Sequence, residues 1–249
     1  MKTKWDYSDL AKAYLKRPEY APEVLRILFE MAGAKKGTKV CDVGAGVAHL
    51  TIPMAKKGYD VTAVEPNDSM RELGQDRTEQ YDNVRWFEAT GEDTGQADGE
   101  FGIVTFGSSF NVCDRQKALA EAARILTPGG WFVCMWNHRD LDDPIQKGIE
   151  EIIKANIEGY GYGTRREDQT EVIDESGLFE TVYPVSGTIL HTQTKKDCIE
   201  AWRSHATLQR QAGDAFPRIV EEIERFVNGQ PDDIIQIPYT TRAWAARKK

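Results

Sequence analysis

The sequence contains no apolar run that approaches the roughly 18–20 residues needed to span a bilayer as a helix. Its first residues, MKTKWDYSDLAKAY, are polar and contain no apolar stretch of the kind found in secretory signals. We therefore expect a soluble, cytoplasmic protein that has no membrane partner.

Cysteine is scarce, with 4 residues in 249 and no C-x-x-C pair. Cys41, Cys113 and Cys134 lie in or beside apolar runs, where cysteine behaves as a small buried hydrophobic residue. A disulfide framework and a zinc site both need paired or closely spaced cysteines, so the sequence predicts neither, and we expect no bound metal.

An excess of basic residues is also missing. The chain has 32 Lys and Arg against 40 Asp and Glu, a formal net charge of −8. Proteins whose main task is to bind a phosphate backbone usually carry a basic excess, so we expect no nucleic-acid partner. Hydrophobic residues make up 40% of the chain, which is enough for a core, and the length suits a single domain, 1–249.

What the sequence does contain is an alternation of short apolar runs with helical stretches. The runs are bounded by Gly, Pro, Asn or Asp, which is typical of buried strands. The predicted strands are 39–43, 60–65, 84–89, 101–107 and 131–136, and the helices between them are 47–57, 68–80 and 114–126. This rhythm predicts an α/β, doubly wound fold, in which helices cover both faces of a parallel sheet.

Further elements are predicted on both sides of this region. Two helices, 6–15 and 21–33, precede the first strand. After it come a helix at 144–157, a loop at 159–168, a strand at 179–191, helices at 195–210 and 215–227, and a strand at 234–246. Pro238 inside the last strand indicates a sheet edge or a bulge.

A glycine-containing turn follows the first predicted strand and opens a helix. Asp42 lies near the end of the strand, and Gly44 and Gly46 lie where a ligand would rest against bare backbone. The dinucleotide pattern G-x-G-x-x-G would need glycine at His49, which counts against NAD or FAD. A plain tight turn is the alternative interpretation.

A carboxylate ends the second predicted strand. Glu65 comes 23 residues after Asp42, at the edge of the sheet where the first strand also ends. A carboxylate at this place can accept hydrogen bonds from both hydroxyls of a ribose. The alternative is a solvated glutamate in a turn.

The order D-x-G-x-G resembles motif I of the class I S-adenosylmethionine-dependent methyltransferases, with Ala48 at the place of a third glycine. LTPGGWFVCMWNHRD (126–140) is similar to the segment leading into the family's fifth strand. AKAYLKRPEYAP (11–22) resembles the opening of a small-molecule subgroup that includes trans-aconitate methyltransferase-like proteins. The resemblance implies a seven-stranded, mostly parallel, Rossmann-like sheet with an antiparallel last strand and helical lid insertions.

The same resemblance implies S-adenosyl-L-methionine as cofactor and S-adenosyl-L-homocysteine as product. It divides the chain into an N-terminal helical cap (1–36), a cofactor-binding core (37–141) and helical lid segments (142–175 and 192–230). Tyr14 and Arg17 are expected to reach the cofactor's carboxylate. The full set of expected cofactor-binding residues is Tyr14, Arg17, Asp42, Gly44, Ala45, Gly46, Glu65, Pro66, Met70, Thr90, Gly91, Glu92 and Gly107.

The acceptor side departs from the family. Many relatives carry a His-Trp pair after the fourth strand, but Asn111 and Val112 stand there, so no catalytic histidine is carried over. The candidate catalytic residues are Asn111 and His138, the latter as a general base or, alternatively, a structural histidine. The expected substrate-binding residues, of which the arginines suit an anionic acceptor, are Phe110, Arg139, Trp202 and Arg203.

These features predict an enzyme that transfers a methyl group to an oxygen or nitrogen of a small-molecule acceptor. A nicotinamide-dependent oxidoreductase and a non-catalytic S-adenosylmethionine-binding module are the alternatives. We expect a monomer or a homodimer.

Overall fold

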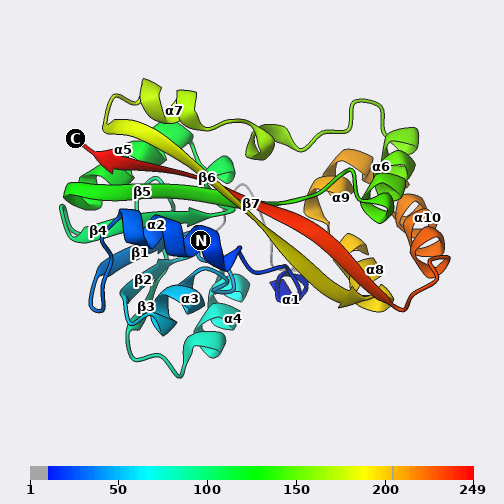
Figure 1. Ribbon diagram of the computed structural model, residues 1–249, viewed down its shortest axis with the longest axis horizontal. Helices are drawn as coiled ribbons and strands as arrows, with labels where there is room; N and C mark the ends of the chain where they lie inside the picture. The colour runs from blue at the N-terminus through cyan, green and yellow to red at the C-terminus, as the bar shows by residue number, and fades with distance from the viewer. Residues whose placement is uncertain (1–10, 204) are drawn as a thin grey trace.

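The computed structural model describes residues 11–203 and 205–249, and within them seven strands form one sheet in the order β3-β2-β1-β4-β5-β7-β6 (Figure 1). The first five strands are parallel, and β7 runs antiparallel to both of its neighbours. The strands are β1 (Lys39–Val43), β2 (Asp60–Val64), β3 (Val84–Phe87), β4 (Phe101–Gly107), β5 (Leu126–Arg139), β6 (Phe179–Thr194) and β7 (Ile234–Lys248). The mostly parallel, seven-stranded sheet with an antiparallel last strand is confirmed.

The central strands are apolar because helices cover both faces of the sheet. One cluster of buried side chains joins the sheet to α5 (Arg115–Ile125) and α7 (Thr170–Glu175). A second cluster, on the other face, joins it to α2 (Pro22–Met31) and α3 (Thr51–Lys56). The doubly wound arrangement predicted from the alternation is therefore present.

Two helices that follow strands begin at side-chain caps. Asn67 accepts a hydrogen bond from the Met70 amide at the start of α4 (Asp68–Thr78), and Asp114 accepts one from the Lys117 amide at the start of α5. Such caps satisfy main-chain donors that have no partner within the helix, and they fix where each helix begins.

A second lobe lies beyond the main sheet. The helices α6 (Pro144–Asn156), α8 (Lys195–Arg203), α9 (Ala206–Ala212) and α10 (Phe216–Asn228) gather at the far ends of β6 and β7 (Figure 1). They share a third buried cluster, to which α10 contributes Ile219, Ile223 and Val227, three residues that lie on one face of the helix. The helical insertions are present, and their role as a lid stays a prediction.

Some predicted boundaries differ from the structure. Residues 6–10 of the helix predicted at 6–15 lie outside the described residues, and the other half of the prediction corresponds to α1 (Ala11–Tyr14). The helix predicted at 47–57 begins only at Thr51, because Ala48 has a φ of 70° and no α-helix contains that conformation. The predicted strand 131–136 is longer, since Leu126 already pairs with Phe101.

The helix predicted at 195–210 is two helices. His205 lies between them with extended backbone, and its ring accepts a hydrogen bond from the Leu208 amide as the N-cap of α9. The loop predicted at 159–168 contains a 3₁₀ turn, Gly163–Arg166, and α7 after it was not predicted.

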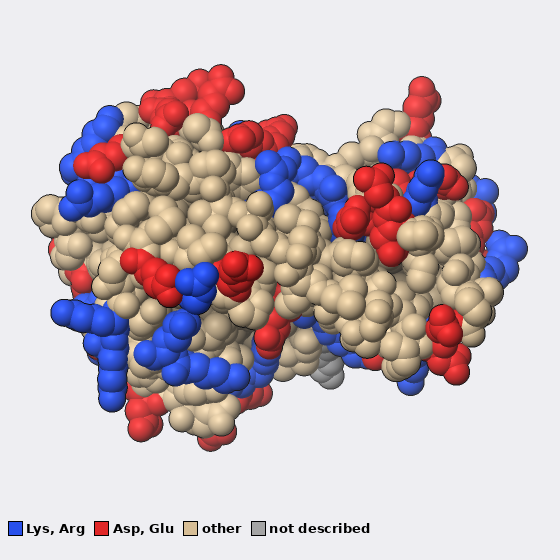
Figure 2. All heavy atoms as spheres, in the orientation of Figure 1, with Lys and Arg blue, Asp and Glu red and all other residues tan. Residues whose placement is uncertain are grey.

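Charged side chains of both signs are interspersed over the face shown in Figure 2. Across the described ranges, no helix combines the length and apolarity required to cross a bilayer. In the same residues no three His, Cys, Asp or Glu side chains are grouped as metal ligands would be.

Candidate active site

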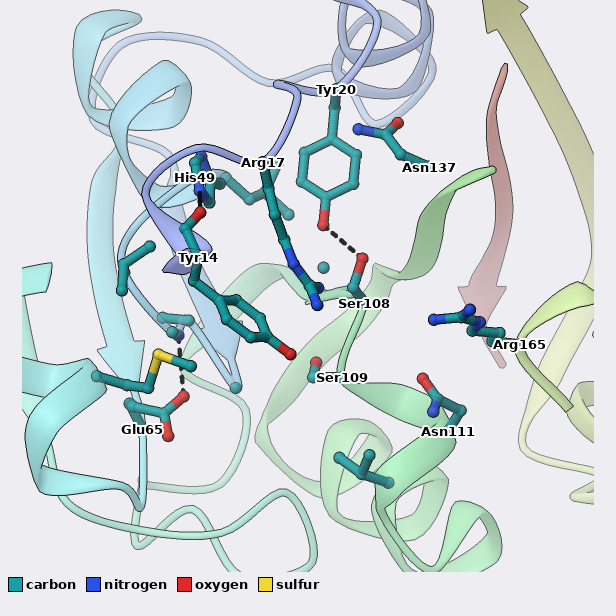
Figure 3. A pocket seen from close by; sticks show the side chains of 18 of the residues that line it. Tyr14, Arg17, Tyr20, His49, Glu65, Ser108, Ser109, Asn111, Asn137 and Arg165 are labelled. Atoms are coloured by element: carbon teal, nitrogen blue, oxygen red, sulfur yellow. Dashed lines mark hydrogen bonds between the residues drawn. The ribbon is translucent and has the colours of Figure 1, made fainter. Parts of the chain in front are cut away.

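A cavity of about 840 Å³ opens at the carboxyl ends of the parallel strands. In open α/β sheets this edge is where ligands bind. Its walls come from the loops after β1, β2, β3 and β4, the end of β5, the segment that joins α1 to α2, and the second lobe. Figure 3 shows Glu65 and Arg165 on opposite sides of this space, with Tyr14 and Arg17 between them.

The glycine turn after β1 forms one wall. Gly44 and Gly46 have φ values of 68° and 55°, which favour glycine. A Cβ on Gly46 would meet no protein atom within 4 Å, so that backbone borders open space. A Cβ on Gly44 would lie 2.4 Å from the Cβ of Ser109. Gly44 is thus required by protein packing as well as by its φ, whereas Gly46 leaves room for a ligand.

Asp42 lies beneath this turn and is 1% exposed. Its carboxylate accepts hydrogen bonds from the hydroxyls of Thr51, at 2.7 Å, and Thr105, at 2.9 Å. Burial raises the pKa of Asp42 to about 6, and the two hydroxyls oppose that rise. The ionised carboxylate places negative charge at the floor of the cavity.

Glu65 is fixed by main-chain donors on both of its oxygens. The amides of Gly46 and Asn67 each donate to it at 2.9 Å, which ties the end of β2 to the glycine turn. Burial raises the pKa of Glu65, and these two amides oppose the rise. A carboxylate has about four acceptor sites, so each oxygen retains capacity for a further donor.

The next stretch of wall comes from the segments that follow β2 and β3. Pro66, Met70, Thr90, Gly91 and Glu92, all expected at the cofactor, line the cavity. The Thr90 amide donates to the carbonyl of Asp93, and Glu92 accepts from the Asp114 amide at 2.7 Å. The first contact closes a turn within the loop after β3, and the second holds that loop against the start of α5.

The segment that joins α1 to α2 crosses the cavity. The guanidinium carbon of Arg17 lies 3.5 Å from the centre of the Tyr14 ring, and both residues line the cavity. His49 Nε2 donates to the Tyr14 carbonyl at 2.7 Å. Burial lowers the pKa of His49 to about 4, so the ring is neutral at pH 7. His49, which stands where the dinucleotide pattern would need glycine, therefore anchors the N-terminal segment through the Tyr14 carbonyl.

Sequence reasoning missed a group of polar residues beside that segment. The Tyr20 hydroxyl and Ser108 Oγ are 3.0 Å apart, and Ser108 has a φ of 62°, which is rare outside glycine. Asn137 donates to the carbonyls of Pro18 and Glu19. Tyr20 and Asn137 both lie within segments that resemble the family, which was the available signal.

The two candidate catalytic residues both line the cavity. Asn111 accepts a hydrogen bond from Trp136 Nε1 at 2.8 Å. His138 is buried, and burial, together with repulsion from Arg166 and other arginines, lowers its pKa to about 4. Its Nε2 is enclosed and has no partner among the described residues. A catalytic role for either residue stays a prediction.

Three of the four expected substrate-binding residues do not line the cavity. Phe110 is fully buried and packs edge-on against Phe106 and Phe132 in the core. Trp202 is buried behind Arg139 and stacks on His205. These two predictions are corrected to packing roles.

Arg203 is corrected for a different reason. It lies on the outside of α8 and pairs with Glu200 at 2.8 Å and with Glu224 at 2.6 Å. Consecutive helix residues point about 100° apart, so burying Trp202 turns Arg203 towards solvent. Arg139, the fourth residue, does line the cavity.

Residues 41–134 match the sequence model of a protein family, and the description of that family is a methyltransferase domain. Demethylmenaquinone methyltransferase of Staphylococcus aureus is 34% identical over 114 residues, which is 44% of this chain and 47% of that protein. The chain thus matches about half the length of this curated relative.

Solved structures share the fold over a longer range. The YcgJ protein of Bacillus subtilis aligns with a TM-score of 0.58 and 15% identity, over 92% of this chain and 99% of that one. Phosphoethanolamine N-methyltransferase 2 of Haemonchus contortus, solved with S-adenosyl-L-methionine, aligns with a TM-score of 0.56 and 16% identity, over 97% of this chain and 57% of that one. The chain is therefore similar to S-adenosylmethionine-dependent methyltransferases, in sequence over residues 41–134 and in its fold.

Proposed function

We propose that the protein binds S-adenosyl-L-methionine and transfers its methyl group to an oxygen or nitrogen atom of a small-molecule acceptor. The observation that carries the proposal is the pairing of Glu65 with Gly46. A buried carboxylate is held by the amide of the one glycine whose missing side chain leaves open space beside the cavity. When bound, the cofactor supplies a methyl group activated by a sulfonium.

The residues along the cavity fit such a ligand. Glu65 retains acceptor sites for ribose hydroxyls, and Met70 offers an apolar wall beside it. Arg17 supplies a cation for the carboxylate of an amino acid, and Asp42 supplies negative charge for its ammonium group. The expected cofactor residues from all of these segments line one continuous cavity.

The protein's own contribution to the reaction would be orientation and exclusion of water. Residues of the segment from Tyr14 to Tyr20 and of the second lobe line the cavity, so an acceptor bound there would be less exposed to bulk solvent. His138 is neutral at pH 7, so it is in the form that accepts a proton, although its low pKa makes it a weak base. This favours an acceptor that is already nucleophilic, and it makes the general-base role of His138 a secondary part of the proposal.

Calorimetric titration tests the cofactor assignment. S-adenosyl-L-homocysteine and S-adenosyl-L-methionine should bind with micromolar or tighter dissociation constants, and NAD should not bind. Binding of NAD in their place would support an oxidoreductase and contradict the proposal.

Turnover needs a separate measurement. Transfer of a labelled methyl group to members of a small-molecule panel separates an enzyme from a non-catalytic binding module. The cytoplasmic location and the choice between monomer and homodimer stay predictions, which fractionation and analytical ultracentrifugation would check.

A further inference from the structure

The two halves of the chain contribute different charges to the cavity. The first half contributes both signs, including Lys16 and Arg17, whereas the second half contributes no acidic residue. The acidic lining residues, Asp42, Glu65, Glu92 and Asp114, all belong to the first half of the chain. Of the described lining residues that follow Asp114, none is acidic. This later group instead contains His138, Arg139, Arg165, Arg166, His191 and His205.

The arginines on this side are held by aromatic rings. The guanidinium carbon of Arg139 lies 4.4 Å from the centre of the Trp202 ring and 5.8 Å from the centre of the Tyr239 ring. The guanidinium carbon of Arg165 lies 5.0 Å from the centre of the Tyr162 ring, and that of Arg166 lies 4.4 Å from it. A guanidinium that rests its face on a ring keeps its N–H edge for other partners.

Carboxylates do not neutralise this group. In residues 11–203 and 205–249, none of the three arginines forms a salt bridge, and the Nε of Arg139 is buried without a partner. Arg166 donates instead to the carbonyl of Arg139, at 3.1 Å. Glu150 lies near Arg166 but accepts a hydrogen bond from Tyr162 and pairs with Lys154 at 3.2 Å.

The charges of Arg165 and Arg166 have an electrostatic cost for the protein alone, since burial lowers the pKa of both. Burial, with repulsion from Arg17 and Arg139, lowers the pKa of Arg165 to about 10. Buried charges in proteins are normally paired, because an unpaired charge loses its hydration without compensation. A ligand that brings negative charge would offset this cost.

We propose that the acceptor is a small organic anion, whose carboxylate or phosphate group is bound by Arg139, Arg165 and Arg166. The inference rests on the proposed methyl transfer, because it places the acceptor opposite Glu65 in the same cavity (Figure 3). A planar fork of N–H donors matches the oxygens of a carboxylate or phosphate, often with two hydrogen bonds at once. The division of charge also separates the two ligands, since a positively charged cofactor is attracted to Asp42 and an anionic acceptor to the arginines.

The test compares anions with neutral molecules of the same shape. Protein saturated with S-adenosyl-L-homocysteine is titrated with benzoate, succinate and phenyl phosphate, and with benzamide, succinamide and phenol, at constant ionic strength. At least one anion should bind ten times more tightly than its neutral counterpart, and the ranking of benzoate against phenyl phosphate distinguishes a carboxylate site from a phosphate site. The inference would be overturned if each anion bound no more tightly than its neutral counterpart, or if no anion bound at all.

Variants assign the binding to particular residues. Arg165→Gln and Arg139→Gln should weaken the selected anion at least tenfold and leave the affinity for S-adenosyl-L-homocysteine unchanged. Arg203→Gln is the matched control, since it removes an arginine of the second lobe that is already paired outside the cavity. Unchanged anion binding in both cavity variants would contradict the assignment.

A second measurement separates ligand binding from a structural role. Without any anion, Arg165→Gln should unfold at the same temperature as wild type or a higher one, because it relieves repulsion, whereas loss of a structural arginine would lower that temperature. If S-adenosyl-L-homocysteine itself does not bind wild type, the proposed function fails. If it binds but anions are not preferred, only the present inference fails.

Discussion

Replacing Asp42 by asparagine should make the protein more stable and the cofactor site weaker. The carboxylate is buried and accepts hydrogen bonds from Thr51 and Thr105, and its pKa is raised to about 6 from the ordinary 3.8. When the pKa of a carboxyl group is higher in the folded protein than in the unfolded chain, the folded protein is more stable with the group protonated than with it ionised. That stability is fully present below about pH 4 and is lost as the pH rises through about 6.

The size of the effect follows from the two pKa values. A difference of about two units at about 1.4 kcal/mol each means that ionised Asp42 costs about 3 kcal/mol. The asparagine variant cannot ionise, so its stability advantage over wild type should grow from about 2 kcal/mol at pH 5 to about 3 kcal/mol at pH 8. For a chain of this size, 3 kcal/mol corresponds to roughly 6–12 °C in melting temperature.

Urea unfolding of both proteins between pH 5 and pH 8 measures this difference, with the exposed Asp232→Asn as control. Cofactor binding should change in the opposite direction. The affinity of wild type for S-adenosyl-L-methionine should rise as the pH rises through about 6, and Asp42→Asn should lose that dependence. A variant less stable than wild type at pH 8, or a stability difference that does not vary with pH, would refute the reasoning.

Three further substitutions test individual placements. Glu65→Gln should weaken S-adenosyl-L-homocysteine by about 1.5–3 kcal/mol in calorimetry, whereas Glu88→Gln, on an exposed residue just past β3, should have no effect. Gly46→Ala should reduce cofactor affinity at least tenfold, while Gly95→Ala, which has a similar positive φ and open surroundings away from the cavity, should cost the same stability of about 1–2 kcal/mol and leave binding intact. Arg203→Ala should cost no more than about 1 kcal/mol of stability and leave the acceptor KM unchanged, so a raised KM would show that its placement outside the site is wrong.

The core of the fold was predictable because strand and helix periods differ. Buried parallel strands are continuous apolar runs, so KVCDV and FGIVTFG identified β1 and β4 directly. The break at His205 was not predictable from periodicity, because its side chain caps α9 through a contact that helical spacing does not encode. The late start of α3 depends on the positive φ of Ala48, and the family comparison gave a hint of it, since glycine is usual there.

The cofactor side of the site could be predicted because it depends on local spacing. Asp42, Gly46 and Glu65 lie at strand ends that the topology brings to one edge. The acceptor side is assembled from segments far apart in the chain, so spacing carried little information about it. Arg165 belonged to a predicted loop, and only the packing of that loop against the end of β5 brings it to the cavity.

The pairing of β6 with β7 restricts where the chain can gain or lose residues. Alternate residues of β6 face inward, and His191 and Gln193 reach the cavity while Leu190 is 54% exposed. A deletion of one residue between Gly187 and His191 would reverse that alternation and turn both cavity residues outward. Natural variation in length is therefore expected at the exposed turn around Pro231, and strands β6 and β7 should keep their residue count.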